Sequence, residues 1–182
     1  EMDEFPILIK FIDAKENLSV QLHPDDSQAK MLENDIGKTE MWYIMDCDPD
    51  AKIICGLKQD ANLDEIEKAN KENIEEFFNY VSVKKGDSIF VESGLVHAIM
   101  ENMLVCEVEQ NSDITYRVYD WDRNDPNRPI HIDKVKKVAK KDLKPIVVKN
   151  QTDKNKCLPI FHNDKFYVDK INVENEFVNK TS

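Results

Sequence analysis

The sequence predicts a mainly β protein, in which many short strands form a sandwich or barrel and a few helices are inserted. Short apolar segments recur along the chain, and turn sequences such as Lys85-Gly86-Asp87 and Ser93-Gly94 separate them. Residues Leu104–Gln110 alternate cleanly between two sets of side chains, as a strand does. Together these features favour a β-sandwich over a helical or α/β fold.

The first part of the chain is predicted to contain four strands and one short helix. The helix, Asp25–Asn34, follows a His-Pro pair and has Asp25 or Asp26 near its N-terminus, where a carboxylate accepts from free backbone N–H groups. The strands are predicted at Phe5–Ala14, Leu18–His23, Glu40–Asp46 and Lys52–Gly56.

A charged segment, Asn62–Val81, is predicted to be one helix, or two helices broken near Asn70–Asn73. Its apolar residues recur at helical spacing, and its charges would form a solvated face. The later predicted elements are short strands within Val83–Asp122, a loop at Arg123–Pro129, a helix at His131–Lys141, a linker at Asn150–Lys156 and a strand at Lys165–Val173.

Composition excludes two classes of function. The net charge of −11 over 182 residues would repel nucleic acid, and no basic stripe offsets it. No apolar run approaches the roughly 18 residues of a membrane span, so we expect no membrane partner. The four cysteines show no C-x-x-C spacing and are expected to be reduced, which predicts a cytoplasmic protein.

Four residues are candidate metal ligands. Gln21 and His23 alternate with Val20 and Leu22, so they would project from one face of a strand. Imidazole nitrogens and carboxylate oxygens suit zinc. The alternative is that the histidines are partly buried and hydrogen-bonded to backbone. The candidates are Gln21, His23, Glu40 and His97.

A second group of polar residues could carry acid–base chemistry. Glu107 and Glu109 are two apart on the alternating strand and would point the same way. Arg117 lies beside another expected strand, and Lys38 is two residues before Glu40. An arginine and a lysine near a carboxylate could bind a phosphate and shift protons. The alternative is ordinary surface ion pairs.

The chain resembles the type I mannose-6-phosphate isomerases, especially their short bacterial form, over about residues 5–143. The combination of Q-x-H-P-D-D, G-K-T-E-x-W-Y and G-x-x-H-A-I is specific to that family. The segments that carry the resemblance are LIKFIDAKENLSVQLHPDD, GKTEMWYIMDCDP, SGLVHAI and EVEQNSDITYRVYDWDR.

The resemblance implies a cupin-type jelly roll that interconverts mannose 6-phosphate and fructose 6-phosphate, a small sugar phosphate, with bound Zn²⁺. The family's zinc ligands fall on Gln21, His23, Glu40 and His97. Its active-site arginine, glutamate and lysine fall on Arg117, Glu107 and Lys38. Aldose–ketose isomerisation moves a proton between C1 and C2, which requires a base, an acid and stabilisation of an oxyanion.

This chain departs from the family pattern at two places, and it is expected to be cut at both ends. Glu92 and Leu95 stand where the family usually has a proline and often a threonine. Residues 1–143 are predicted to form the catalytic domain without its N-terminal strands, and residues 144–182 a linker and the start of a second cupin-like lobe. The alternatives to an isomerase are a non-catalytic zinc- or sugar-binding cupin module, a truncated inactive fragment, or a different cupin enzyme. The oligomeric state is left open.

Overall fold

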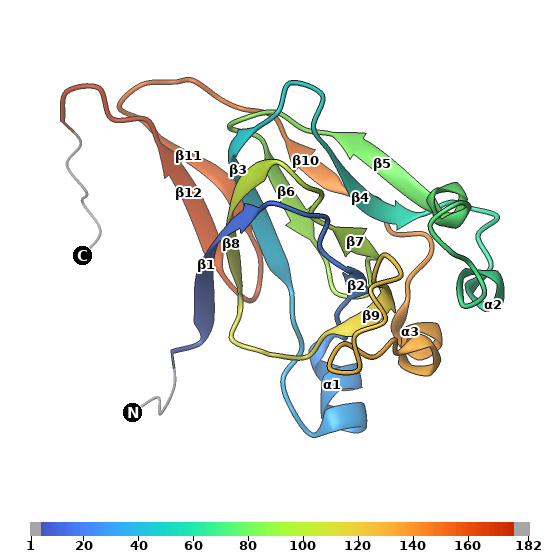
Figure 1. Ribbon diagram of the computed structural model, residues 1–182. Helices are drawn as coiled ribbons and strands as arrows, with labels where there is room; N and C mark the ends of the chain where they lie inside the picture. Colours follow the sequence, from blue (N-terminus) through green and yellow to red (C-terminus); the bar gives the residue numbers. More distant parts are fainter. Residues whose placement is uncertain (1–4, 177–182) are drawn as a thin grey trace.

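The computed structural model describes residues 5–176 and contains two five-stranded antiparallel sheets (Figure 1). This is the mainly β sandwich that the sequence predicts. The first sheet has the order β1 (Ile7–Ala14), β8 (Met103–Gln110), β3 (Glu40–Cys47), β6 (Ser88–Val91) and β10 (Ile146–Val148). The second has the order β5 (Phe78–Ser82), β4 (Lys52–Leu57), β7 (His97–Ala98), β2 (Val20–Leu22) and β9 (Tyr116–Tyr119).

One apolar cluster joins the two sheets into a single core. Trp42 and Val105 come from the first sheet, and Val20, Ile54 and Phe78 from the second, and all five are almost completely buried. Burying side chains of this size removes apolar surface from water and is the main favourable contribution to folding. The core therefore fixes how the two sheets face each other, and with them the residues of the site.

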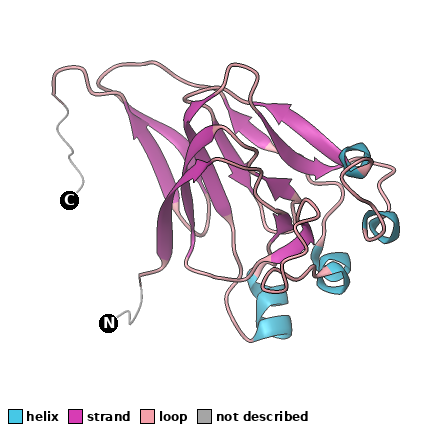
Figure 2. Ribbon diagram, viewed as in Figure 1, coloured by secondary structure: helices cyan, strands magenta, loops and turns pink. Residues whose placement is uncertain are grey.

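The helices gather on the side of the molecule that holds the second sheet (Figure 2). Helix α1 (Asp26–Glu33) begins as predicted: the Asp25 carboxylate accepts from Gln28 N, and the Gln28 side chain accepts from Asp25 N. This capping box satisfies backbone donors that a helix leaves free. The other helical elements are α2 (Leu63–Ile66), the 3₁₀ turn η1 (Ile74–Phe77) and α3 (Ile132–Val138).

The single helix predicted at Asn62–Val81 is wrong, and the alternative of two helices broken near Asn70–Asn73 is confirmed only in part, as two short helical segments on either side of that break. Only α2 and η1 are helical there, and residues 78–82 form strand β5, which pairs with β4 so that Val81 lies opposite Ile53. Pairing with an edge of the second sheet satisfies the backbone of this segment and buries Phe78 completely. Tertiary packing therefore overrides the helical spacing of the apolar residues.

The segment after residue 143 contains three further strands. β10 pairs with β6 at the edge of the first sheet, and β11 (Cys157–His162) and β12 (Tyr167–Ile171) form a separate hairpin. Phe161 and Phe166 pack this hairpin on Met41 of β3. The division of the chain at residue 143 stays a prediction.

Two further observations concern membrane-spanning segments and the cysteines. Within residues 5–176, no helix has the length and apolarity that a bilayer crossing requires. All four cysteines are free thiols, and Cys55 is the buried one.

Candidate metal centre and active site

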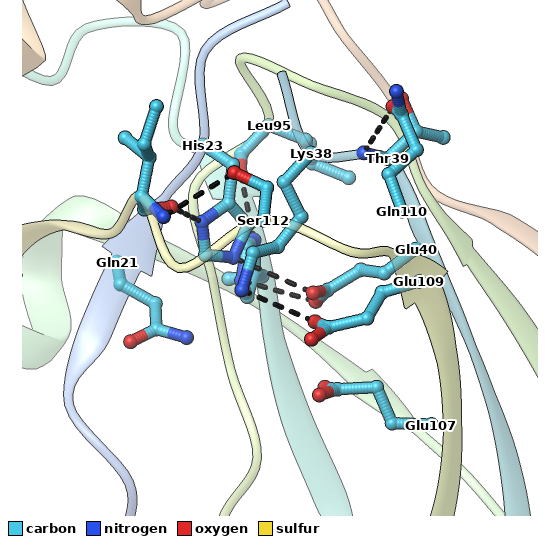
Figure 3. Close-up of polar contacts among 12 residues, drawn as sticks. Gln21, His23, Lys38, Thr39, Glu40, Leu95, Glu107, Glu109, Gln110 and Ser112 are labelled. Atoms are coloured by element: carbon cyan, nitrogen blue, oxygen red, sulfur yellow. Dashed lines mark hydrogen bonds and ion pairs between the residues drawn. The ribbon is translucent and has the colours of Figure 1, made fainter. Parts of the chain in front are cut away.

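The two sheets bring His23, Glu40 and His97 together at a buried point; Figure 3 labels His23 and Glu40 there. His23 follows β2 and His97 opens β7 in the second sheet, while Glu40 opens β3 in the first. The Glu40 carboxylate lies between the two rings: Oε2 is 3.4 Å from His23 Nε2, and Oε1 is 3.3 Å from His97 Nε2. At most 2% of any of the three residues is exposed. The sequence predicted these three residues as ligands, and the fold places them together.

Backbone carbonyls orient both imidazole rings. His23 Nδ1 lies 2.7 Å from the Ile114 carbonyl oxygen, and His97 Nδ1 lies 2.8 Å from that of Leu95. A carbonyl only accepts, so each Nδ1 carries the proton and donates it. Each Nε2 then presents a lone pair to Glu40, and neither nitrogen has a hydrogen-bond donor in the described part of the chain. This is the arrangement by which second-shell carbonyls orient metal-binding histidines.

The electrostatics of the trio also favour a cation. Burial lowers the pKa of His23 to about 3 and that of His97 to about 4, so both rings are neutral at pH 7. Neutral imidazoles and a carboxylate are the forms in which these side chains bind a metal. A buried carboxylate oxygen of Glu40 lacks a hydrogen bond within residues 5–176. The donor set therefore fits a divalent metal ion better than it fits an ordinary hydrogen-bonded core.

Gln21, the fourth predicted ligand, lies opposite His97 in the pairing of β2 with β7. Its amide oxygen accepts a hydrogen bond of 3.1 Å from the Ser19 hydroxyl, and Figure 3 shows its side chain apart from the trio. Gln21 also lines the cavity beside Glu40 and His97. The strand register therefore places Gln21 next to His97, but its role as a ligand stays a prediction.

A cavity of about 150 Å³ opens beside the trio and separates the two sheets. Its walls differ in chemistry, because the second sheet contributes Gln21 and His97 while the first contributes carboxylates. The polar lining also includes Lys10, Lys38, Glu40, Glu107, Glu109 and Thr115, and Ile12, Leu18, Trp42 and Ile99 complete it. A polar cavity of this kind suits a small hydroxylated or charged molecule.

Glu107 is the carboxylate whose protonation is most strongly shifted. Burial, together with the nearby Glu40 and Glu109 carboxylates, raises its pKa to about 8 against the opposing effects of Lys10 and the Trp42 hydrogen bond. Its Oε2 accepts a 2.9 Å hydrogen bond from Trp42 Nε1, and its Oε1 lies 3.4 Å from Lys10 Nζ. A carboxyl with this pKa can hold or release a proton near neutral pH.

Lys38 and Lys10 flank the carboxylates from two strands. Lys38, just before β3, is 5% exposed, and its Nζ lies 3.2 Å from Glu109 Oε2. Lys10 on β1 donates to Glu109 Oε1 and also reaches Glu107. Lys38 and Glu109 form a buried ion pair, whereas the Lys10 side chain is 38% exposed, so the surface ion pairs weighed as the alternative do not describe the Lys38 contact.

Arg117, the predicted active-site arginine, shares a strand face with the cavity residues. It lies opposite Gln21 in the pairing of β9 with β2, and it is two residues from Thr115. Its Nη1 donates to the Pro129 carbonyl at 3.5 Å, so the guanidinium points to the following loop. Among the described residues that line the 150 Å³ cavity, Arg117 is absent.

Sequence reasoning missed Lys10 and Trp42. A lysine inside the apolar run at the start of the chain was the available signal, because its alternation with exposed Ile9 and Phe11 places it on the inward face. Its partner could not be read from the sequence, since Lys10 lies opposite Glu107 only through the pairing of β1 with β8.

Of the two departures from the family pattern, Leu95 contacts His97 through its backbone carbonyl, which does not depend on the identity of the side chain. Glu92 lines a separate hollow with Asp25 and Lys140. Neither change removes one of the side chains that form the trio.

Comparison with known proteins agrees with this geometry. A family model described as phosphomannose isomerase type I, catalytic domain, matches residues 1–46. The mannose-6-phosphate isomerase ManA of Bacillus subtilis is 45% identical over 138 residues, which are 74% of this chain and 44% of the relative. The mannose-6-phosphate isomerase of Streptococcus mutans is 39% identical over 132 residues, covering 71% of this chain and 42% of the relative. The chain therefore spans less than half the length of these relatives.

Solved structures extend the match to the fold. The crystal structure of mannose 6-phosphate isomerase from Bacillus subtilis superposes with a TM-score of 0.76 at 35% identity, covering 92% of this chain and 55% of the other. A variant of phosphomannose isomerase from Salmonella typhimurium, at 14% identity and a TM-score of 0.62, shares the fold. The cupin-type jelly roll that the resemblance implies is thereby confirmed, and over the matched residues the chain is similar to type I phosphomannose isomerases.

Proposed function

We propose that this chain carries the catalytic centre of a zinc-dependent isomerase that interconverts mannose 6-phosphate and fructose 6-phosphate. The observation that carries the proposal is the convergence of two bare imidazole nitrogens and a buried carboxylate beside a cavity that also holds Glu107. The names of the relatives from Bacillus subtilis and Streptococcus mutans supply the substrate. Because the chain spans less than half of them, the activity is proposed for the whole protein of which this chain is the matching part.

The metal in this proposal is zinc, held by His23, Glu40 and His97 with Gln21 as the fourth ligand. Two imidazoles, a carboxylate and one further oxygen are donors that zinc accepts in tetrahedral or slightly expanded geometry. When bound, zinc supplies a positive charge that polarises and orients the oxygens of the sugar.

The chain's own residues would move the proton and stabilise charge. Glu107, with its pKa raised to about 8, is the candidate that takes a proton from one of the two sugar carbons and returns it to the other. Lys38 would neutralise the phosphate of the substrate or assist in stabilising the developing oxyanion. Arg117 would stabilise charge from the strand face next to Gln21, provided its guanidinium turns from Pro129 toward the cavity.

One observation favours a second candidate, a cupin module that binds metal or sugar without turnover. The Arg117 guanidinium contacts the Pro129 carbonyl, and the described lining of the cavity lacks it. A module of this kind would load metal and bind sugar phosphate but would not isomerise it. The two candidates therefore differ in turnover and agree in metal content.

The test compares His97→Gln with His162→Gln in the native, full-length protein. His162 is a matched control, because it is a histidine on the exposed β11–β12 hairpin that pairs with Asp169. We expect His97→Gln to lose most bound zinc and nearly all turnover, and His162→Gln to keep both. Zinc is measured by elemental analysis, and turnover by conversion of mannose 6-phosphate.

Two results would contradict parts of this proposal. Stoichiometric zinc in His97→Gln would remove His97 from the ligand set. A wild-type protein that contains zinc and binds mannose 6-phosphate but does not convert it would exclude the isomerase and support the binding module.

A further inference from the structure

Glu109 lies between two ammonium groups inside the cavity. It is on β8, is completely buried, and points to the same face as Glu107. One carboxylate oxygen faces Lys10 and the other faces Lys38. Lys10 is on β1 and Lys38 lies just before β3, and these two strands flank β8 in the first sheet, so the single carboxylate of Glu109 connects lysines from both of its neighbours.

The two contacts of Glu109 are of different kinds. Oε1 accepts a hydrogen bond from Lys10 Nζ. Oε2 lies 3.2 Å from Lys38 Nζ, but it makes no hydrogen bond within the described part of the chain. The contact with Lys38 is therefore Coulombic, and it has the weaker geometry of the two. A stronger acceptor entering the cavity would compete most easily for Lys38.

The other carboxylates of the cavity do not bridge the two lysines. Glu40 lies between the rings of His23 and His97, and Glu107 is held by Trp42 Nε1. Glu109 alone among the described carboxylates contacts both cavity lysines. Without its charge, the buried Lys38 ammonium and the partly buried Lys10 ammonium would face the cavity with one fewer counter-ion, which is costly where water is excluded.

We propose that Glu109 is an internal counter-ion that occupies an anion-binding lysine pair and thereby sets the affinity of the cavity for phosphate. An anionic phosphate oxygen that enters the cavity has to compete with Glu109 for Lys38 and Lys10. Glu109 is then a specificity-determining residue, because it weakens the binding of any small anion that offers no further contacts. This inference uses the same cavity as the proposed isomerase and deepens that proposal, but its readout is binding and not turnover.

The experiment measures the affinity of inorganic phosphate for the zinc-loaded, full-length protein by calorimetry at low ionic strength. Glu109→Gln removes the charge and keeps the shape of the side chain, and we expect it to bind phosphate about tenfold more tightly than the wild type. Glu101→Gln is the matched control, since Glu101 is an exposed glutamate in the turn before β8 and its change alters net charge equally. The control is expected to bind as the wild type does.

A second variant assigns the effect to the lysine pair. Adding Lys38→Met to Glu109→Gln should abolish the gain, because the ammonium that the phosphate would contact is gone. If Glu109→Gln does not fold, as judged by circular dichroism, Glu109→Asp replaces it: the charge stays, but the shorter side chain cannot reach both lysines, and a smaller gain is expected.

Several outcomes would overturn the inference. Phosphate affinity in Glu109→Gln that is unchanged or lower than in the wild type would show that Glu109 does not compete with anions. A gain that survives Lys38→Met would place the anion elsewhere. A wild-type protein without isomerase activity would contradict the proposed function but would leave this binding test intact, so the two failures are distinguishable.

Discussion

The two walls of the site stabilise their buried polar groups in different ways. The histidine wall, formed by Gln21, His23 and His97 on the second sheet, is neutral, and backbone carbonyls hold both rings. The acid wall is formed by Glu40, Glu107 and Glu109 on the first sheet (Figure 3). Lysine ammonium groups and a tryptophan N–H compensate its carboxyl groups.

This difference suggests a division of labour. Carbonyl-oriented, neutral imidazoles are arranged to hold a cation, whereas a buried carboxyl with a raised pKa is arranged to exchange a proton. Glu40 is the residue that belongs to both, because its carboxylate contacts the histidines from the acid wall. Variants on the two walls should therefore fail in different ways.

The largest effect is expected for Glu107→Gln in the full-length protein. The amide cannot exchange a proton, so turnover should fall by roughly 10²-fold or more, which is the usual contribution of general acid–base catalysis. Zinc content should be unchanged, in contrast to His97→Gln. The measurements are the rate of mannose 6-phosphate conversion and elemental analysis, with Glu101→Gln as the control. Ordinary turnover in Glu107→Gln would remove Glu107 from the proton-transfer candidates.

In the metal-free chain, the contributions of the two walls to the free energy of unfolding should change with pH in opposite directions. Burial lowers the pKa values of His23 and His97 below the usual 6.5, so their contribution is present above pH 6.5 and is lost as the pH falls toward 4. Burial raises the pKa of Glu107 from 4.5 to about 8, so its contribution is present below pH 4.5 and is lost as the pH rises through 8. Between pH 4.5 and 6.5 the two contributions oppose each other.

Glu107→Gln should expose the histidine contribution. Its free energy of unfolding should fall more steeply than that of the wild type between pH 6.5 and 4.5, by about 1.4 kcal/mol per pH unit for the one proton that is removed. Urea unfolding with a chelator present measures this slope, and Glu101→Gln should run parallel to the wild type. Parallel curves for Glu107→Gln and the wild type would show that the pKa of Glu107 is not raised.

A smaller effect is expected where the two walls touch. Trp42 packs edge-on against the His97 ring, with centroids 5.4 Å apart, and donates Nε1–H to Glu107. Trp42→Phe keeps an aromatic ring but leaves a buried acceptor without its donor, so we expect a loss of about 1–3 kcal/mol in the free energy of unfolding. Urea unfolding measures it.

Trp121→Phe is the matched control for this change, because Trp121 donates to the Leu18 carbonyl at 2.8 Å and is only half-buried. Its loss should be smaller, about 1 kcal/mol or less. Equal losses for the two variants would mean that the hydrogen bond to Glu107 has no special weight.

Much of this arrangement could be predicted from the sequence where the pattern is local. Alternation along β8 places Glu107 and Glu109 on one face. The Gln-x-His spacing predicts the same for Gln21 and His23, although β2 ends at Leu22, before His23. The capping box of α1 is also a local signal, contained within four residues. These features depend only on the period of a strand or on the start of a helix.

Features that depend on partners distant in the sequence could not be predicted in this way. Residues 78–82 have helical spacing but become β5 because β4 offers them an edge to pair with. Lys10 meets Glu107 and Glu109 through a pairing that spans almost a hundred residues. The direction of the Arg117 guanidinium depends on the loop at Pro129, which no pattern in β9 specifies.

The central claim is that the histidine wall and Glu40 form a metal centre in this chain. The most direct test is the zinc content of the purified chain by elemental analysis, after dialysis without chelator. We expect about one zinc per chain, as one set of four ligands requires. A folded chain that holds no zinc, even after zinc has been added back, would contradict the claim.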